Sequence, residues 1–219
     1  MAKDMVKEIL VVAKKDKVAF IDLQFSDFLG NTKSSTIPIY NFSDALTRGV
    51  WIDGSSIEGF ARIHESDMYL MPDPTTYALI PWRNHEAGGR VARVICDVYK
   101  PNHEPFEGDP RNILIRVLKE VKDLGFEYFT GPECEFFLLP KREDGSIIYE
   151  TQGNGFYFNL IMDEAYTIKR EIMEALDQMG ITTETSTHEV AHRQHEIDIR
   201  YDRALKTADN TITLKMAAK

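Results

Sequence analysis

The chain of 219 residues is 43% hydrophobic and carries 35 acidic against 26 basic side chains, a formal net charge of −9. This negative balance repels phosphate groups, so it argues against nucleic acid or an anionic membrane as a partner. No apolar run approaches the roughly 18 residues that a membrane-spanning helix needs. The N-terminus lacks a signal-peptide pattern, and the two cysteines, Cys96 and Cys134, form no disulfide framework. We therefore expect a globular, cytoplasmic protein.

The first half of the chain alternates helix and strand patterns. Residues 6–15 predict a short amphipathic helix, and residues 17–27 then place an apolar residue at every second position, Ala19, Ile21, Leu23 and Phe25, on one face of a strand. The turn-forming string DFLGNTK follows, which predicts a hairpin into a second strand at residues 34–39. Residues 90–100, RVARVICDVYK, are rich in β-branched side chains and predict a further strand.

A linker is indicated by the string PNHEPFEGDP, residues 101–110, because prolines and glycine interrupt regular structure. Asp109 is well placed to cap the helix that follows, with Pro110 at its first position. We place a domain boundary in this linker. The predicted domains are residues 1–103 and residues 104–219.

The second half begins with a helical pattern that ends at Gly125, a common helix-terminating residue. A strand follows, and a second helix is predicted from about Asp163 to Met179. The string HEIDIRY, residues 195–201, then alternates apolar and polar residues as a strand does. Strands grouped with helices in this order indicate an α+β fold with a curved sheet.

Two glutamates one residue apart, Glu133 and Glu135, lie within the apolar string GPECEFFLLP. In a strand these positions share a face about 7 Å apart, so both carboxylates point the same way. One interpretation is a solvated outer face. Phe137 and Leu138 favour a strand covered on both sides, where unpaired carboxylates would cost several kcal/mol. A divalent cation would remove that cost, and oxygen ligands favour Mg²⁺, Mn²⁺ or Ca²⁺.

More acidic residues follow between positions 184 and 198, where a polar stretch leads into the last predicted strand. They are Glu184, Glu189, Glu196 and Asp198. The alternative to a ligand set is a charged surface strand, since nearby arginines could pair with these acids. Those arginines are Arg193, Arg200 and Arg203.

The string HEVAH, residues 188–192, matches the zinc-protease pattern H-E-x-x-H. That pattern binds zinc only on a helix, where the two histidines lie one turn apart. The preceding TTETST is rich in β-branched residues and poor in helix formers. We therefore interpret the match as accidental.

Three strings together, WIDGSSIEGFARIHESDMYLMPD, GPECEFFLLP and HEVAHRQHEID, resemble type I glutamine synthetase in their order and separation. The resemblance runs from about residue 5 to the C-terminus. It implies an N-terminal β-grasp domain followed by a catalytic domain with a curved, barrel-like sheet. It also implies active sites formed between the subunits of a dodecamer. The implied reaction is ATP-dependent ligation of ammonia to L-glutamate through a glutamyl phosphate.

The resemblance also implies roles for individual residues. One Mg²⁺ or Mn²⁺ ion would be held by Glu135, Glu189 and Glu196, and a second by Glu133. Glu184 would be the acidic residue that contacts ATP, and Tyr201 would be the aromatic residue associated with its adenine. Ammonium would be bound and deprotonated by Asp53 with Ser56 nearby, at a neighbouring subunit's site, while Tyr157 would line the ammonium pocket.

The resemblance covers about half of the family's length and stops inside the catalytic domain, so we expect the chain alone to be inactive. The alternative is a non-catalytic homologue that acts as an assembly partner or regulator of a full-length synthetase. A ligase for an amine larger than ammonia also stays open. Three residues depart from the family pattern: Thr187 replaces one of the usual paired histidines, and His192 and Arg193 replace a proline-glycine or similar small pair.

Overall fold

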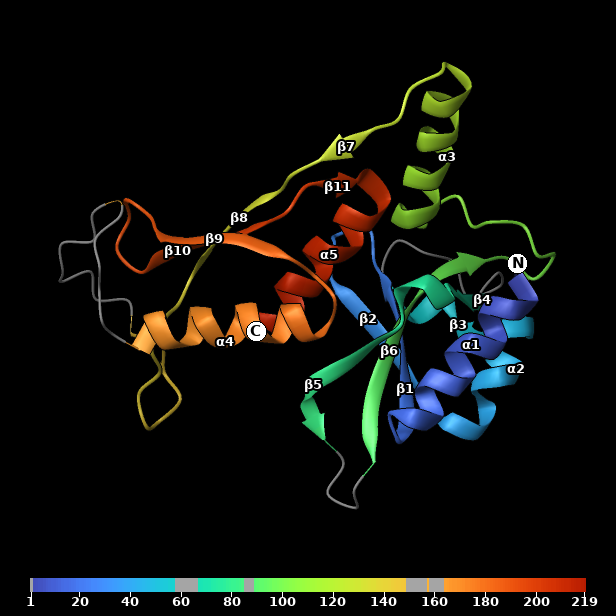
Figure 1. The fold of residues 1–219 in the computed structure, drawn as a ribbon, viewed down its shortest axis with the longest axis horizontal. Coiled ribbons are helices and arrows are strands. Elements are labelled where there is room, and N and C mark those ends of the chain that lie inside the picture. The colour runs from blue at the N-terminus through green and yellow to red at the C-terminus, as the bar shows by residue number, and fades with distance from the viewer. Residues whose placement is uncertain (1, 58–66, 85–88, 149–156, 158–163) are drawn as a thin grey trace. The chain divides into compact units, whose positions relative to one another are not determined.

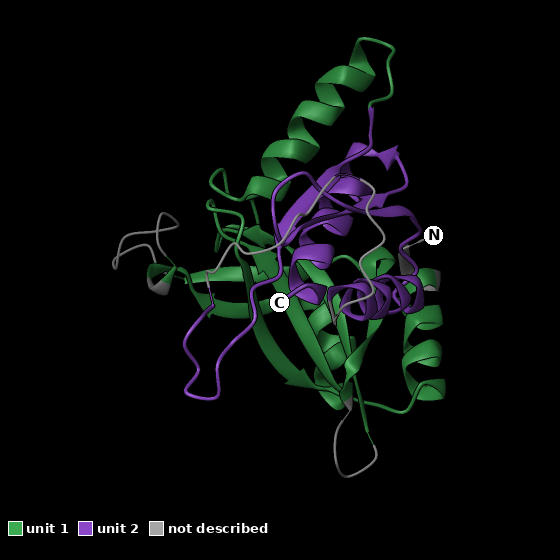
Figure 2. Cartoon of the chain, turned by 90° about the vertical axis from the view of Figure 1, so that its left-hand side faces the viewer, with its two compact units in different colours: residues 1–128 green, residues 129–219 purple. Residues whose placement is uncertain are grey.

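The computed structural model describes residues 2–57, 67–84, 89–148, 157 and 164–219. The chain divides into two compact units, Met1–Tyr128 and Phe129–Lys219, which we call unit 1 and unit 2 (Figure 2). Strands and helices occur in both, and the predicted α+β class is confirmed. None of the described helices is long and apolar enough to span a membrane. The predicted boundary near residue 103 stays a prediction.

Unit 1 is organised around a sheet to which the described residues contribute six strands. Its path runs through β2 (Thr32–Pro38), β1 (Val18–Ser26), β6 (Arg90–Tyr99), β4 (Asp67–Pro72) and β3 (Val50–Asp53), and β5 (Ala78–Asn84) also pairs with β6 (Figure 1). The predicted hairpin is confirmed, because β1 and β2 pair antiparallel. The parallel pair of β1 and β6 forms the centre of the sheet.

Helices α1 (Ala2–Lys15) and α2 (Phe42–Arg48) pack against each other and against this sheet (Figure 1). The predicted inward face of β1 is confirmed, since Ile21 and Leu23 are fully buried. They join Phe42 of α2 and apolar residues of β4 and β6 in one core. Burial of this apolar surface is the main stabilising contribution to the unit.

Helix α3 (Pro110–Asp123) follows the predicted linker and begins as its sequence indicates. The carboxylate of Asp109 accepts a hydrogen bond from the backbone N–H of Arg111 at 3.1 Å, and Pro110 is the first helical residue. The other oxygen of Asp109 accepts one from the backbone N–H of Val98 on β6 at 3.0 Å. The cap therefore also ties the start of α3 to the sheet.

Unit 2 contains a three-stranded antiparallel sheet in the order β8 (Glu133–Phe137), β10 (Gln194–Ile199), β9 (Thr183–His188). A short second ladder joins β7 (Phe129–Thr130) to β11 (Asp202–Arg203). Helix α4 (Glu164–Gln178) confirms the second predicted helix, although its predicted start at Asp163 lies outside the described residues. Helix α5 (Ala204–Ala217) completes the unit.

Among the described residues, a core covers one face of the three-stranded sheet and no second core covers the other. Ile197 and Ile199 of β10 are buried with Ile172 and Leu176 of α4 and Leu214 of α5. The partly buried Cys134 and Phe136 of β8 pack against the same core. Because neighbouring residues of a strand point to opposite faces, the even-numbered residues of β10 and the odd-numbered residues of β8 lie on the side away from this core.

Candidate metal centre

The register of the three strands sets three polar residues in one row across the uncovered face. Glu196 of β10 lies opposite Glu135 of β8 on one side and opposite Thr187 of β9 on the other. Side chains directly opposite each other in a sheet have Cβ atoms about 5 Å apart. Two carboxylates and a hydroxyl are therefore neighbours, although 61 positions separate Glu135 from Glu196 along the chain.

The third carboxylate, Glu189, follows the last residue of β9 in the turn that leads to β10. Its backbone N–H donates to the carbonyl oxygen of Gln194 at 2.9 Å, and the Gln194 N–H donates to Ala191 at 3.1 Å, which closes the turn. His188 ends β9, and the residues of HEVAH beyond it are not helical. Our interpretation of the zinc-protease match as accidental is therefore confirmed.

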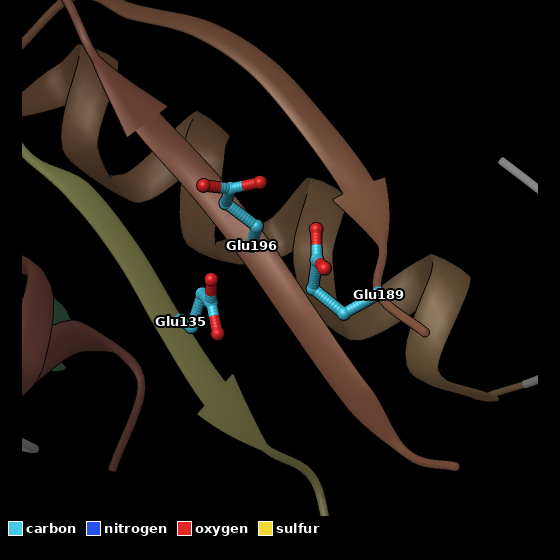
Figure 3. Close-up of side chains that lie close together, drawn as sticks. All are labelled: Glu135, Glu189 and Glu196. Atoms are coloured by element: carbon cyan, nitrogen blue, oxygen red, sulfur yellow. The ribbon is translucent and has the colours of Figure 1, made fainter. Parts of the chain in front are cut away.

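Together Glu135, Glu189 and Glu196 each offer a carboxylate oxygen, and these oxygens lie within 4.8 Å of one another. Figure 3 shows the three side chains on the near side of the strands, with Glu196 between the other two. Glu135 is exposed, whereas Glu189 and Glu196 are partly buried. Three convergent carboxylate oxygens form a donor set that suits a hard divalent cation such as Mg²⁺ or Mn²⁺.

The expectation that β8 is covered on both faces is wrong. Glu133 and Glu135 are exposed, and Phe137 is 55% exposed. Only the side with Cys134 and Phe136 packs against a core. Burial of the E-x-E pair therefore gives no reason for a cation. Crowding of acidic groups from three segments is the observation that favours one.

Glu196 is the cluster residue whose pKa is raised by its neighbours. Loss of solvation and then the negative charges of Asp198 and Glu189 raise the pKa of Glu196 above its ordinary value. The Thr187 hydroxyl, which donates to Glu196 Oε2 at 3.2 Å, acts in the opposite direction. A bound cation would relieve the repulsion between these carboxylates, because it favours the charged form of each.

Glu133 lies on the same face but outside the three-carboxylate cluster. Its register partner on β10 is Asp198, whose Oδ2 accepts a hydrogen bond from the Thr185 hydroxyl. The other oxygen of Asp198 is buried and has no hydrogen-bond partner among the described residues. The separate cation role of Glu133 stays a prediction.

The two residues predicted to contact ATP are both at the surface of unit 2. Glu184 lies on β9, is exposed and does not belong to the cluster. Tyr201 follows β10 and is 63% exposed. Its ring meets the edge of Phe129 with 6.4 Å between the centroids. Their roles stay predictions.

Tyr157 is 47% exposed, and its pKa responds to the acidic cluster. Loss of solvation, then the charge of Glu189, then that of Glu196, raise the pKa of the Tyr157 phenol above its ordinary value. A negative field at this tyrosine is compatible with the predicted ammonium pocket. The role itself stays a prediction.

Asp53 belongs to unit 1, where it ends β3. Its Oδ1 accepts hydrogen bonds from the backbone N–H and hydroxyl of Ser55 at 2.9 and 2.6 Å, which caps a short 3₁₀ turn, η2 (Gly54–Ser56). Asp53 is exposed. The backbone of Ser56 lies in this turn, and residues 58–66 of the same string fall outside the described residues.

Sequence reasoning missed the residues that hold two of the carboxylates. The side-chain amide of Gln194 donates to Glu135 Oε2, and the Thr187 hydroxyl donates to Glu196. Gln194 stands two positions before Glu196 on the same strand face, so strand periodicity alone could have placed it beside the acids. For Thr187 the signal is weaker, because its partner depends on the pairing of β9 with β10.

Comparison with known proteins gives the family. Residues 17–101 match the model "Glutamine synthetase, beta-Grasp domain", and residues 107–219 match "Glutamine synthetase, catalytic domain". The chain is 47% identical to a glutamine synthetase of Thermotoga maritima over 95% of this chain and 47% of the relative. It is 46% identical to one of Methanocaldococcus jannaschii over 98% of this chain and 49% of the relative. The chain therefore spans about half the length of the curated relatives it matches.

Solved structures agree with the fold. A GmaS/ADP complex matches with a TM-score of 0.83 at 25% identity, over 96% of this chain and 48% of that one. A Plasmodium falciparum glutamine synthetase matches in fold, with a TM-score of 0.82 at 22% identity, over 98% of this chain and 47% of that one. The predicted β-grasp domain and curved, half-barrel sheet are confirmed. The chain belongs to the glutamine synthetase family.

Proposed function

We propose that this chain supplies the metal-binding strands of a glutamine synthetase, which ligates ammonia to L-glutamate at the expense of ATP through a glutamyl phosphate. The observation that supports this most directly is the convergence of Glu135, Glu189 and Glu196 within 4.8 Å. Identity of 45–47% to curated glutamine synthetases supports the same reaction.

In this proposal the three glutamates hold one Mg²⁺ or Mn²⁺ ion, and Glu133 contributes to a second. When bound, the cations screen the phosphate charge of ATP so that an anionic nucleophile can approach it. Glu184 and Tyr201 would contact the nucleotide at its polar and adenine parts. Gln194 and Thr187 orient the carboxylates through their hydrogen bonds.

The ammonia step needs residues that gather a cation and then remove its proton, because ammonium has no free lone pair. We assign these tasks to Asp53, with Ser56 nearby, and to Tyr157. Asp53 is exposed, and its carboxylate oxygen Oδ1 is oriented by Ser55. It would therefore serve the site of a neighbouring subunit in a homo-oligomer, a dodecamer in the family, or in an assembly with a full-length homologue.

The two free cysteines support a reducing compartment, and we propose the cytoplasm. Burial raises the pKa of both the Cys96 and the Cys134 thiols, which makes them poor nucleophiles. Neither cysteine therefore takes a chemical part in the proposed reaction.

The test is phosphate release from ATP that depends on both L-glutamate and ammonium. The chain is assayed alone and after mixing with a separately expressed C-terminal half of the Thermotoga maritima relative. We expect release only in the mixture, and we expect Glu196→Gln in this chain to abolish it. Glu174→Gln, an exposed change on α4, is the control.

Two outcomes would contradict the proposal. Release without glutamate would indicate an unrelated phosphatase activity. No release in any mixture, together with co-elution of the chain with a full-length relative in gel filtration, would favour the assembly partner or regulator. Replacing ammonium by methylamine in the same assay tests whether the amine is larger than ammonia.

A further inference from the structure

Two of the three carboxylates in the acidic cluster accept a hydrogen bond from a neutral side chain. Gln194 donates its side-chain amide to Glu135, and Thr187 donates its hydroxyl to Glu196 Oε2 at 3.2 Å. Among the described residues, no basic side chain forms an ion pair with any of the three glutamates. Glu135 and Glu196 are thus oriented by donors that carry no positive charge.

The backbone of Thr187 is held from two directions, by the neighbouring strand β10 and by helix α4. Its backbone pairs with β10 opposite Glu196, and its carbonyl oxygen accepts a hydrogen bond from the Lys169 ammonium of α4 at 3.1 Å. Lys169 is itself buried. A β-branched side chain on such a backbone has few rotamers, so the hydroxyl is held in one direction. That direction is toward the central carboxylate of the cluster.

The central position of Glu196 makes its orientation important. It lies between Glu135 and Glu189 (Figure 3) and experiences the negative charges of Glu189 and Asp198. Without a donor, repulsion would favour rotamers that turn its carboxylate away from the others. A lysine or arginine at position 187 would hold Glu196 but would also compete with a divalent cation for it. A hydroxyl holds the group without that competition.

We propose that Thr187 is a positioning residue for the cation site, acting through Glu196 and not by contact with the cation. This inference rests on the proposed function, because it assumes that the cluster binds Mg²⁺ or Mn²⁺. Hydrogen-bonding partners of metal ligands commonly change metal affinity by about 10- to 100-fold when they are removed. We expect a change at the lower end of that range, because the donor to Glu196 is a neutral hydroxyl and Glu196 is only partly buried.

The experiment measures Mn²⁺ affinity by isothermal calorimetry on the full 219-residue chain. Thr187→Val keeps the shape of the side chain and removes the hydroxyl, whereas Thr187→Ser keeps the hydroxyl. We expect Thr187→Val to weaken binding by about tenfold and Thr187→Ser to stay within about twofold of the original chain. Thr185→Val is the matched control, because the Thr185 hydroxyl serves Asp198, outside the cluster. Thermal unfolding followed by circular dichroism checks that each variant is folded.

The possible results separate the two proposals. If the unaltered chain binds Mn²⁺ and Thr187→Val binds it equally well, the positioning role is overturned and the cation site remains. The same conclusion follows if Thr187→Ser is as weak as Thr187→Val, since the hydroxyl would then be irrelevant. If the unaltered chain does not bind Mn²⁺, both the cation site and the positioning role are overturned.

Discussion

Each unit contains a group of carboxylates, and among the described residues only the group in unit 1 is paired with an arginine. In unit 1, Arg111 forms ion pairs with Asp73 at 2.8 Å and with Asp97, while Asp109 accepts two backbone hydrogen bonds beside them. In unit 2, the three glutamates of the cluster have no such arginine among the described residues. In unit 1 the chain itself therefore supplies the cation that the carboxylates need.

This difference separates a structural charge cluster from a candidate binding site. Arg111 is buried and Asp109 is 0% exposed, and the partly buried Asp73 and Asp97 already have Arg111 as their cation. The cluster in unit 2 lies on a sheet face that no described core covers. Three convergent carboxylates without a basic partner among the described residues favour binding of a divalent cation from solution.

The largest expected effect is a loss of stability when the buried arginine of unit 1 is replaced. Arg111→Met should lower the free energy of unfolding by about 3 kcal/mol, the lower end of the range for a broken buried pair, because it leaves the partly buried Asp73 and Asp97 without their cation. Urea unfolding at pH 7 measures this. Arg116→Met, an exposed change on the same helix, is the control and should alter stability by less than about 0.5 kcal/mol. Equal stability of the two variants would show that the buried arginine is not needed to balance these acids.

The next effect concerns pH. Burial raises the pKa of Asp109 to about 6, against the lowering effect of its hydrogen bonds to Val98 and Arg111. Between the ordinary pKa of 3.8 and about 6, the folded protein holds this proton more tightly than the unfolded chain does. Its contribution to stability is therefore greatest below pH 4 and is lost as the pH rises toward 6.

Asp109→Asn removes this titration. The stability of the original chain minus that of the variant should fall by about 2.5 kcal/mol between pH 4 and pH 7, since one pKa unit corresponds to about 1.4 kcal/mol and part of the shift from 3.8 to about 6 lies below pH 4. Urea unfolding of both proteins at several pH values measures the difference. A difference that is constant across this range would place the pKa of Asp109 in the ordinary range.

In unit 2 the corresponding change should separate stability from binding. Glu196→Gln should weaken Mn²⁺ binding by about 100-fold, roughly 2.7 kcal/mol, because it removes the central carboxylate. Without metal the same variant should be unchanged or more stable by up to about 1 kcal/mol, since like charges no longer face each other. Calorimetry and urea unfolding give the two values. A large loss of stability without metal would mean that Glu196 is structural, as Arg111 is.

The smallest effect concerns Arg193, which occupies a left-handed backbone conformation with φ 62° and whose Nε has no hydrogen-bond partner among the described residues. Arg193→Gly should stabilise the turn by about 1 kcal/mol, because glycine adopts this conformation without steric cost. It should also tighten Mn²⁺ binding, since a positive charge near the acids is removed.

Arg193→Ala separates the two causes. It removes the charge but keeps a Cβ at the left-handed position, so it should tighten Mn²⁺ binding without the gain in stability. Unchanged Mn²⁺ affinity in both variants, measured by calorimetry, would show that the Arg193 charge does not reach the cluster.

Much of the fold was accessible from local sequence patterns. The alternation in residues 17–27 predicts β1 because side chains of a strand point to opposite faces. Asp109 and Pro110 predict the start of α3, because a helix leaves its first N–H groups without partners and these residues suit that position. The resemblance to glutamine synthetase is carried by three short strings, and it predicts the same three glutamates that the structure brings together.

Other features of the site were not accessible in this way. Strand periodicity places Glu133 and Glu135 on one face but cannot say whether that face is covered, and the expectation that it is covered was wrong. Coverage depends on which helices pack on which side of the sheet. Likewise, the sequence left open whether Asp198 pairs with a nearby arginine, and its hydrogen bond with Thr185 depends on the pairing of β9 with β10.

Local sequence patterns determined the positions of β1, β2, β6, β10, α3 and α4, the cap at Asp109 and the shared face of Glu133 and Glu135, because each depends on residues within a few positions of one another. Only the tertiary structure decided that Glu196 lies between Glu135 and Thr187, since the strand register joins segments far apart in the chain. It also decided that Arg111 forms ion pairs with Asp73 and Asp97 in unit 1. Which charges are balanced inside a protein depends on through-space distances, and these are set by the packing of the whole unit.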